Sequence, residues 1–457
     1  MRLRGADRRR GEEAPRTSTV RLRTWCRGAS RGAARRHPVL FGAQEPDPLP
    51  RMVKDRTMRR RGDSGTAVVV ALAVVAFNLR TPLTGIPTIV GDVRASTGLG
   101  VVGIGVLTTL PVLCMGALAV VVPGAGARFG ASRAVWLATG LLALGMALRA
   151  GGATPAVLYA SALICGVGIA MAGGLVPGIV RDQRPDRLGL VTGVWTASMS
   201  VGAALAAALT VPLTEWLGSW QLALAVWAIP AALAWALWTL VERPHRVAPP
   251  VLPASSLRDL PWRDRPSWAI TAFLAANSLV FYSSVAWLAP SLTARGLSAS
   301  ASGVLFAVFT AVGIISALTL PPLLQRTRHP RALLTTMALA AAASLLGLAV
   351  APRTAPTLWV VAFGIANAGW FTMGLAVIGL MSRDGAGTAR LTGMAFTVQY
   401  LVAAIGPTAC GLLLAATGSY TVLFVVLAAT CVLATAAIPR IRWELGGPHA
   451  PAPLPEA

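Results

Sequence analysis

The sequence predicts an all-α membrane protein whose twelve transmembrane helices form two pseudo-symmetric six-helix halves. The first observation behind this fold class is composition, because 55% of the 457 residues are hydrophobic and only 12% are charged. Soluble domains carry about 25% charged residues. The second observation is a set of long apolar runs, and the third is an internal repeat that relates the runs of one half to those of the other.

The apolar runs have the length of membrane-spanning helices, because about 20 helical residues cross about 30 Å of hydrocarbon. Several runs contain proline or glycine, which transmembrane helices tolerate when neighbouring groups satisfy the freed backbone atoms. In chain order the twelve runs lie at 67–90, 101–122, 134–150, 155–178, 188–212, 219–240, 267–290, 299–321, 332–350, 357–380, 391–415 and 420–439.

The internal repeat emerges when the sequence is compared with itself. A shift of 198 residues places Gly105-Val106-Leu107 on Gly303-Val304-Leu305. A shift of 200 residues places Thr192-Gly193 on Thr392-Gly393. Because the two shifts nearly agree along a six-helix unit, we expect two parallel repeats with the same helix order.

The expected segments follow from composition and from the repeat. They are a basic arm at 1–64, a first half at 65–240, a cytoplasmic linker at 241–266, a second half at 267–439 and a cytoplasmic tail at 440–457. The arm is predicted to be disordered, and it lacks the apolar core of a secretory signal. Two interpretations of the arm stay open: a segment attracted to anionic lipid, or an over-extended gene start with Met52 or Met58 as initiator.

The formal net charge of +23 is spread unevenly along the chain. Of the 40 Lys and Arg residues, 18 precede residue 66 and 17 lie in alternate connections, whereas the other connections carry four, which are Arg94, Arg149, Arg295 and Arg353. Because positive residues concentrate on the cytoplasmic side, we expect a multi-pass protein of the cell membrane with both termini in the cytoplasm. The charge pattern therefore indicates the lipid bilayer as a partner rather than nucleic acid.

Arg80 is the strongest indication of function, because it lies alone within the first apolar run. No acidic residue occurs in the membrane interior to neutralise it. A cation at bilayer depth costs at least about 2.5–3.5 kcal/mol on insertion scales, and it usually faces a cavity with a partner. Pro82, Gly85 and Pro87 predict a kink beside it. We expect Arg80 to bind a small anion, and a clamp on backbone carbonyls is the alternative.

Other polar or aromatic residues inside the runs are candidates for the same site. Thr84 lies one turn from Arg80 and shares its face, while Asn78 lies on another face, where helix packing is the alternative. The remaining candidates share a position inside a run, and packing is the alternative for each. They are Trp195, Asn277, Tyr282, Trp287, Asn367, Trp370, Gln399 and Tyr400.

The repeat of two parallel six-helix units resembles the plan of the major facilitator superfamily. The connection Pro123–Arg133 is similar to a conserved loop of that family, although Ala127 stands where the family usually has an aspartate. The resemblance implies a monomeric transporter that binds a small-molecule solute near the midplane between its halves. Alternating access would then follow from one half rocking against the other.

Charged residues in equivalent connections of the two halves are candidates for a cytoplasmic gate. Inter-half ion pairs would close the inside entrance, and solvated loops are the alternative. The expected gating residues are Arg128, Arg181, Asp182, Arg187, Arg383, Asp384 and Arg390.

At a finer level the chain resembles the cyanate/nitroimidazole (CynX/NimT) branch of that superfamily. The similar stretches include Asn78-Leu79-Arg80, Phe281-Tyr282, Arg390–Met394 and Gln399-Tyr400. This resemblance implies transport of small anions such as cyanate, or of nitroaromatic compounds. The chain departs from the branch at Asn277, where relatives often have glutamine, and in the register of the break after Thr84.

Several function classes are disfavoured by what the runs lack. An intramembrane enzyme would need a nucleophile with its base, or metal ligands, within the spans, and the membrane interior holds no His, Asp or Glu. The sequence has no nucleotide-binding loop, so ATP-driven transport is not expected. No cofactor or metal is expected. Facilitated diffusion, exchange and proton coupling through the substrate all stay open, and an exporter of small drug-like compounds is the alternative function.

Overall fold

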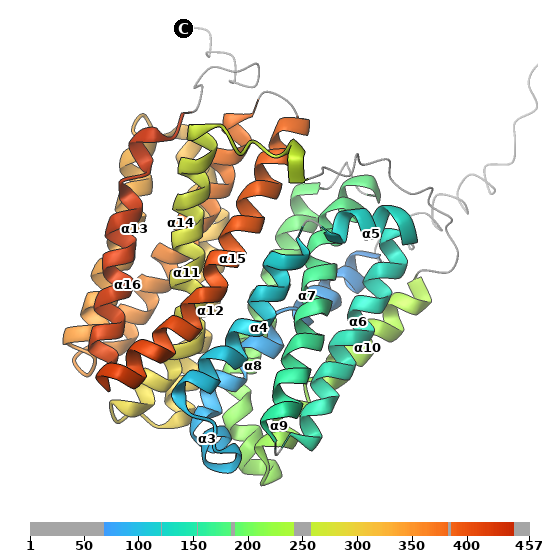
Figure 1. Cartoon of the computed structure of the whole chain (residues 1–457), viewed down its shortest axis with the longest axis vertical. Coiled ribbons are helices and arrows are strands. Elements are labelled where there is room, and N and C mark those ends of the chain that lie inside the picture. The colour runs from blue at the N-terminus through green and yellow to red at the C-terminus, as the bar shows by residue number, and fades with distance from the viewer. Residues whose placement is uncertain are drawn as a thin grey trace, which may run out of the picture. The chain divides into compact units, whose positions relative to one another are not determined.

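The computed structural model describes residues 68–119, 121–152, 154–183, 188–241, 257–382 and 385–442 (Figure 1). All of them belong to one compact unit, Thr57–Ala457. The predicted arm at 1–64, most of the linker and most of the tail lie outside the described residues. The division of the chain at 241–266 stays a prediction, and we use "first half" for residues 68–241 and "second half" for residues 257–442.

The described residues form helices and no strands, and twelve of the helices are long and apolar enough to cross a membrane. This confirms the predicted fold class. The first span, Val68–Thr97, contains α2 (Thr81–Thr84), η1 (Ile86–Ile89) and α3 (Val90–Thr97). The first half continues with α4 (Val101–Leu118), α5 (Val121–Phe129), α6 (Ala131–Leu148), η2 (Arg149–Gly151), α7 (Pro155–Gln183), α8 (Leu188–Leu217), α9 (Trp220–Ala225) and α10 (Ala228–Val241).

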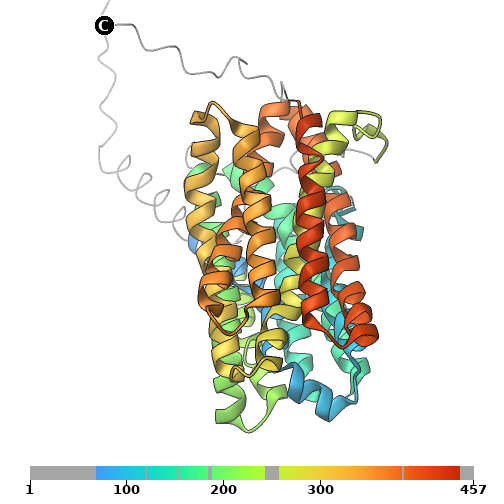
Figure 2. The same ribbon diagram turned by 90° about the vertical axis from the view of Figure 1, so that its left-hand side faces the viewer.

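The second half has the same sequence of long helices, which run side by side in yellow to red in Figure 2. Its elements are η4 (Leu257–Asp259), α11 (Arg265–Ala294), α12 (Ala299–Arg326), α13 (Pro330–Val350), α14 (Pro356–Met381), α15 (Gly385–Thr417), α16 (Tyr420–Thr435) and η5 (Ile438–Arg440). Many helices extend a few residues beyond the apolar runs, because a helix continues into polar residues where it leaves the hydrocarbon.

Two pairs of long helices make the main contacts between the halves, since α4 packs along α15 and α8 packs along α12, while α11 also packs against η1. Glycine allows close approach in both pairs. A Cβ atom added at Gly105 would lie 2.8 Å from the carbonyl oxygen of Pro407, and one added at Gly303 would lie 2.6 Å from that of Ala207. The two glycines are 198 residues apart and their partners 200 apart, which are the shifts of the sequence repeat. The two contacts are therefore pseudo-symmetric equivalents.

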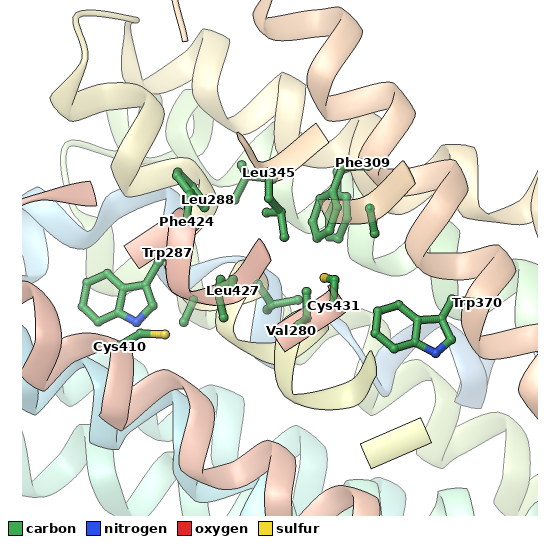
Figure 3. Close-up of a cluster of buried hydrophobic side chains, with 14 of the residues drawn as sticks. Val280, Trp287, Leu288, Phe309, Leu345, Trp370, Cys410, Phe424, Leu427 and Cys431 are labelled. Carbon is green, nitrogen blue, oxygen red and sulfur yellow. The ribbon is translucent and has the colours of Figure 1, made fainter. Parts of the chain in front are cut away.

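Polar side chains add to the contact between α4 and α15. The Thr109 hydroxyl donates to the carbonyl of Ala404 over 2.9 Å and lies 2.8 Å from the Thr408 hydroxyl. Inside the second half, large side chains fill the interior, and Figure 3 shows Trp287 and Trp370 among them. Both indoles are almost fully buried.

We predict that Gly105→Ala and Gly303→Ala each weaken the contact between the halves. The added methyl would press on a backbone carbonyl, and such overpacking costs about 1–3 kcal/mol. Disulfide formation between Thr109→Cys and Thr408→Cys, in a background without the native cysteines, reports how closely α4 of the first half approaches α15 of the second. We expect slower cross-linking in both alanine variants.

Gly100→Ala is the matched control, because a Cβ at Gly100 meets nothing within 4 Å and the backbone there has a φ of −71°. Equal cross-linking rates in Gly105→Ala and Gly100→Ala would contradict the prediction.

Candidate functional site

The first span is interrupted beside Arg80, as predicted. The initial helix, 68–78, gives way to a turn at Leu79 and Arg80, and α2 is only four residues long. Pro82 has no N–H to donate, so it interrupts the ladder of helical hydrogen bonds. Gly85 then bends the chain before η1.

Threonine hydroxyls add hydrogen bonds to carbonyls around this interruption, and among these carbonyls that of Asn78 lies four residues before Pro82, which has no N–H to donate to it. Thr81 donates to the carbonyl of Asn78 over 3.2 Å, Thr84 to that of Arg80 over 3.1 Å, and Thr88 to that of Gly85 over 2.7 Å. All three side chains are buried. The hydroxyl hydrogen of Thr84, a candidate for solute contact, is thus committed to the backbone of Arg80.

Arg80 reaches from the first half toward the second. Its guanidinium carbon lies 5.0 Å from the centre of the Phe281 ring on α11, and its charge lies close enough to interact electrostatically with Tyr282 and Tyr400. The side chain is half-buried. Among the described residues, none accepts a hydrogen bond from this guanidinium or forms an ion pair with it. The charge therefore faces ring electrons instead of a carboxylate.

The rings around Arg80 form a continuous aromatic cluster, which we define as Phe281, Tyr282, Phe309, Phe396 and Tyr400. Ring centres are 5.1 Å apart for Phe281 and Tyr282, 5.8 Å for Phe281 and Phe309, 6.2 Å for Tyr282 and Tyr400, and 5.7 Å for Phe396 and Tyr400. Sequence reasoning missed three of these rings. Phe281 adjoins Tyr282, and Phe396 lies one helical turn from Tyr400, so their spacing was an available signal.

A second group of candidates forms a polar layer in the second half, on α11, α14 and α15. Asn277 donates from Nδ2 to the carbonyl of Asn367 over 3.0 Å, and Ser278 donates to Oε1 of Gln399 over 3.1 Å. Within the described part of the chain, Nδ2 of Asn367, Nε2 of Gln399 and Nε1 of Trp370 are buried with no acceptor. These three groups hold spare hydrogen-bond donors that a solute or water can use.

Other predicted site residues join helices to one another. Asn78 donates from Nδ2 to the carbonyls of Val74 and Pro230, over 2.8 and 3.1 Å. Trp287 donates from Nε1 to the carbonyl of Pro407 over 2.9 Å. Trp195 is half-buried on α8, against the core of the first half. Their donors meet backbone or packing surfaces, and a role in solute binding stays a prediction for each.

The gating residues are described only in part. Arg128 is exposed at the end of α5, and Arg390 is exposed on α15. The side chains at 181, 182, 187, 383 and 384 lie outside the described residues. The cytoplasmic gate stays a prediction.

The structure corrects the expectation that Arg149 lies in a connection between spans. Its side chain is only 2% exposed. Nε donates to the Ser161 hydroxyl over 2.9 Å, and Nη2 donates to the carbonyl of Pro82 over 3.2 Å. A helical side chain leans toward the amino end of its helix, so a residue at the carboxyl end of a span can place a long side chain inside the membrane.

We predict different effects of removing the two buried indole N–H groups. Trp287→Phe removes the hydrogen bond that joins α11 to the carbonyl of Pro407 in α15, and one such hydrogen bond contributes about 0.5–1.5 kcal/mol. We therefore expect a lower unfolding temperature, measured in detergent by loss of the monodisperse protein on heating. Trp370→Phe is the matched control, because its N–H has no acceptor among the described residues. An equal loss of stability in both variants would contradict this assignment.

Comparison with known proteins identifies the family. A sequence model described as Major Facilitator Superfamily matches residues 68–407. The uncharacterized transporter YycB of Bacillus subtilis (strain 168) is 31% identical over 374 residues, which are 81% of this chain and 92% of the relative.

Two relatives from Escherichia coli (strain K12) carry substrate names. The 2-nitroimidazole transporter is 30% identical over 79% of this chain and 91% of the relative. The cyanate transport protein CynX is 27% identical over 77% of this chain and 91% of the relative.

Among solved structures, a bacterial homologue of the human lysosomal transporter Spinster, in an inward-facing and occupied conformation, has a TM-score of 0.68 at 16% identity. The match covers 83% of this chain and 99% of that one, and it supports the fold alone.

Proposed function

Because the chain belongs to the Major Facilitator Superfamily, we propose that it moves a small anion across the cytoplasmic membrane by alternating access, with Arg80 as the anion-binding residue. The relatives named above are transporters, and the chain is not an enzyme. The coarse function, solute transport by a multi-pass membrane protein, follows from the family.

The observation that carries the proposal is the charge of Arg80 at a helix break, with no acidic or hydrogen-bonding partner in the described part of the chain. A guanidinium offers five N–H donors in a planar fork that matches a carboxylate or a similar anion. The ring faces beside it stabilise a cation by about 0.5–2 kcal/mol, which is less than burial of a charge costs. A bound anion would supply the rest.

The place of Arg80 between the halves supports alternating access. Arg80 belongs to the first half, whereas the rings of Phe281, Tyr282 and Tyr400 belong to the second. A solute held by the guanidinium would thus touch both halves at once. The spare donors of Asn367, Gln399 and Trp370 are proposed to contact the solute from the second half, on the ground that they lack acceptors within the described residues.

The names of the relatives guide the choice of substrate. We propose cyanate or a carboxylate-like anion, because one relative is named for cyanate transport and Arg80 supplies the positive charge. The alternative is export of nitroaromatic or other small drug-like compounds. The aromatic cluster favours that alternative, since flat rings stack on Phe and Tyr, and a second relative is named for 2-nitroimidazole.

The proposed orientation places both termini in the cytoplasm, because the connections on that side carry most of the positive residues. The proposed inside gate uses Arg128, Arg390 and the charged residues near 181–187 and 383–384. Coupling to a proton gradient would pass through the substrate's own ionisation. A pH gradient imposed on vesicles distinguishes this route from exchange or facilitated diffusion.

We predict that Arg80→Ala lowers cyanate counterflow in proteoliposomes by more than about tenfold, because a hydrogen bond to a charged group is worth about 1.5–3 kcal/mol. Arg80→Lys keeps the charge without the planar fork, so we expect intermediate transport. Arg94→Ala is the control, since Arg94 is an exposed cation of the same span.

The same vesicles distinguish the two substrates. Cyanate is expected to compete with 2-nitroimidazole, and the competition should disappear in Arg80→Ala. Transport by Arg80→Ala at the wild-type rate for both compounds would refute the role of Arg80. Loss of cyanate transport alone would identify the nitroaromatic site as separate from the guanidinium.

A further inference from the structure

Arg149 is a second positive charge buried in the first half, and its contacts lead to the interruption beside Arg80. It follows α6 directly, at the start of η2. Two of its nitrogens are fixed by hydrogen bonds, one to Ser161 on α7 and one to the backbone of Pro82 in α2. Arg149 therefore ties three spans together at one point.

The carbonyl of Pro82 needs an external donor because of where α2 ends. A helix leaves its last four carbonyls without intrahelical partners, and α2 stops at Thr84. Local threonine hydroxyls reach the carbonyls of Asn78, Arg80 and Gly85. The carbonyl of Pro82 instead receives its hydrogen bond from another span.

Ser161 fixes the direction of the guanidinium from its other side. Its hydroxyl donates to the carbonyl of Gly145 over 2.7 Å, so its oxygen is free to accept from Nε of Arg149. Ser161 is fully buried. The chain Gly145, Ser161, Arg149 and Pro82 thus links the backbone of α6 to that of α2 through oriented hydrogen bonds. Such a chain resists rotation of the short helix α2.

A buried guanidinium is a costly way to hold a carbonyl. Among the described residues no carboxylate forms an ion pair with Arg149, and removing a charge from water carries a penalty that neutral hydrogen bonds offset only in part. A small hydroxyl residue could cap a nearby carbonyl at lower cost, as the threonines do. A long side chain that ends in a planar guanidinium fork is required only if a distant backbone must be held in one place.

We propose that Arg149 is a positioning residue for Arg80, which it serves by holding the Pro82 carbonyl and so fixing the direction in which the Arg80 side chain leaves the interruption. The inference rests on the proposed role of Arg80 in anion binding. Pro82 lies two residues after Arg80, so a rotation of α2 carries Arg80 away from the ring of Phe281. Arg149 then determines solute affinity without touching the solute.

The first test measures the clamp without any solute. Hydrogen exchange of the amides at 79–90 is compared in wild type, Arg149→Met and Arg149→Lys. The matched control is Arg295→Met, because Arg295 donates to the carbonyl of Leu348 and lies over the ring of Phe424, far along the chain from the broken span. Faster exchange at 79–90 in Arg149→Met but not in Arg295→Met is expected. Unchanged exchange in Arg149→Met would overturn the clamp.

The second test measures cyanate counterflow by the same variants. Arg149→Met is expected to raise KM by about tenfold, the equivalent of one hydrogen bond to a charged group, while the maximal rate is largely kept. Arg149→Lys should be intermediate, because an ammonium keeps the charge but not the two-donor geometry. If Arg149→Met fails to fold, Ser161→Ala replaces it, since it removes only the orienting hydroxyl and should raise KM in the same direction.

The two tests distinguish a failure of the positioning role of Arg149 from a failure of the proposed function of Arg80. A wild-type KM in Arg149→Met, together with a raised KM in Arg80→Lys, would refute the positioning role and leave the function of Arg80 intact. Wild-type cyanate transport by Arg80→Lys and Arg80→Ala would refute the proposed function, while the exchange at 79–90 still decides whether Arg149 holds the broken span.

Discussion

The interruption of the first span is the constraint on which the candidate site depends. Pro82 removes one hydrogen-bond donor, and Gly85 bends the chain a few residues later. In a membrane each unsatisfied carbonyl costs several kcal/mol, and here short backbone hydrogen bonds, threonine hydroxyls and one guanidinium bind the carbonyls around the break. The same break turns Arg80 out of the helix toward α11. The direction of the Arg80 side chain therefore depends on the hydrogen bonds that bind the carbonyls at the break.

The two halves touch where glycine, which has no side chain, lets the backbone of one helix contact that of another. Gly105 and Gly303 lie against the carbonyls of Pro407 and Ala207, at positions related by the repeat. Lipid tails are apolar, so the hydrophobic effect contributes little to helix association in a membrane. Close packing and hydrogen bonds such as that of Thr109 stabilise the contact instead. Contacts of this kind depend on a close fit between the backbones of neighbouring helices.

Buried side-chain N–H donors without acceptors are shared unequally between the halves within the described residues. In the first half the carbonyls around the break are bound, and Arg149 commits its donors to Ser161 and Pro82. In the second half, Asn367, Gln399 and Trp370 keep buried donors without acceptors among the described residues. The first half thus supplies a fixed charge, and the second supplies rings and spare N–H groups.

Hydropathy, charge bias and self-similarity determined twelve spans, the repeat and the isolation of Arg80, because each is a property of the chain read along its length. Proline and glycine after Arg80 also predicted the break, since their effect on the backbone is local. Only the tertiary structure decided that Phe281 meets the guanidinium, that Thr84 serves the backbone, and that Arg149 is buried rather than in a connection. Such outcomes depend on how each helix is rotated and how deep it sits against distant helices, and no local pattern of residues specifies either.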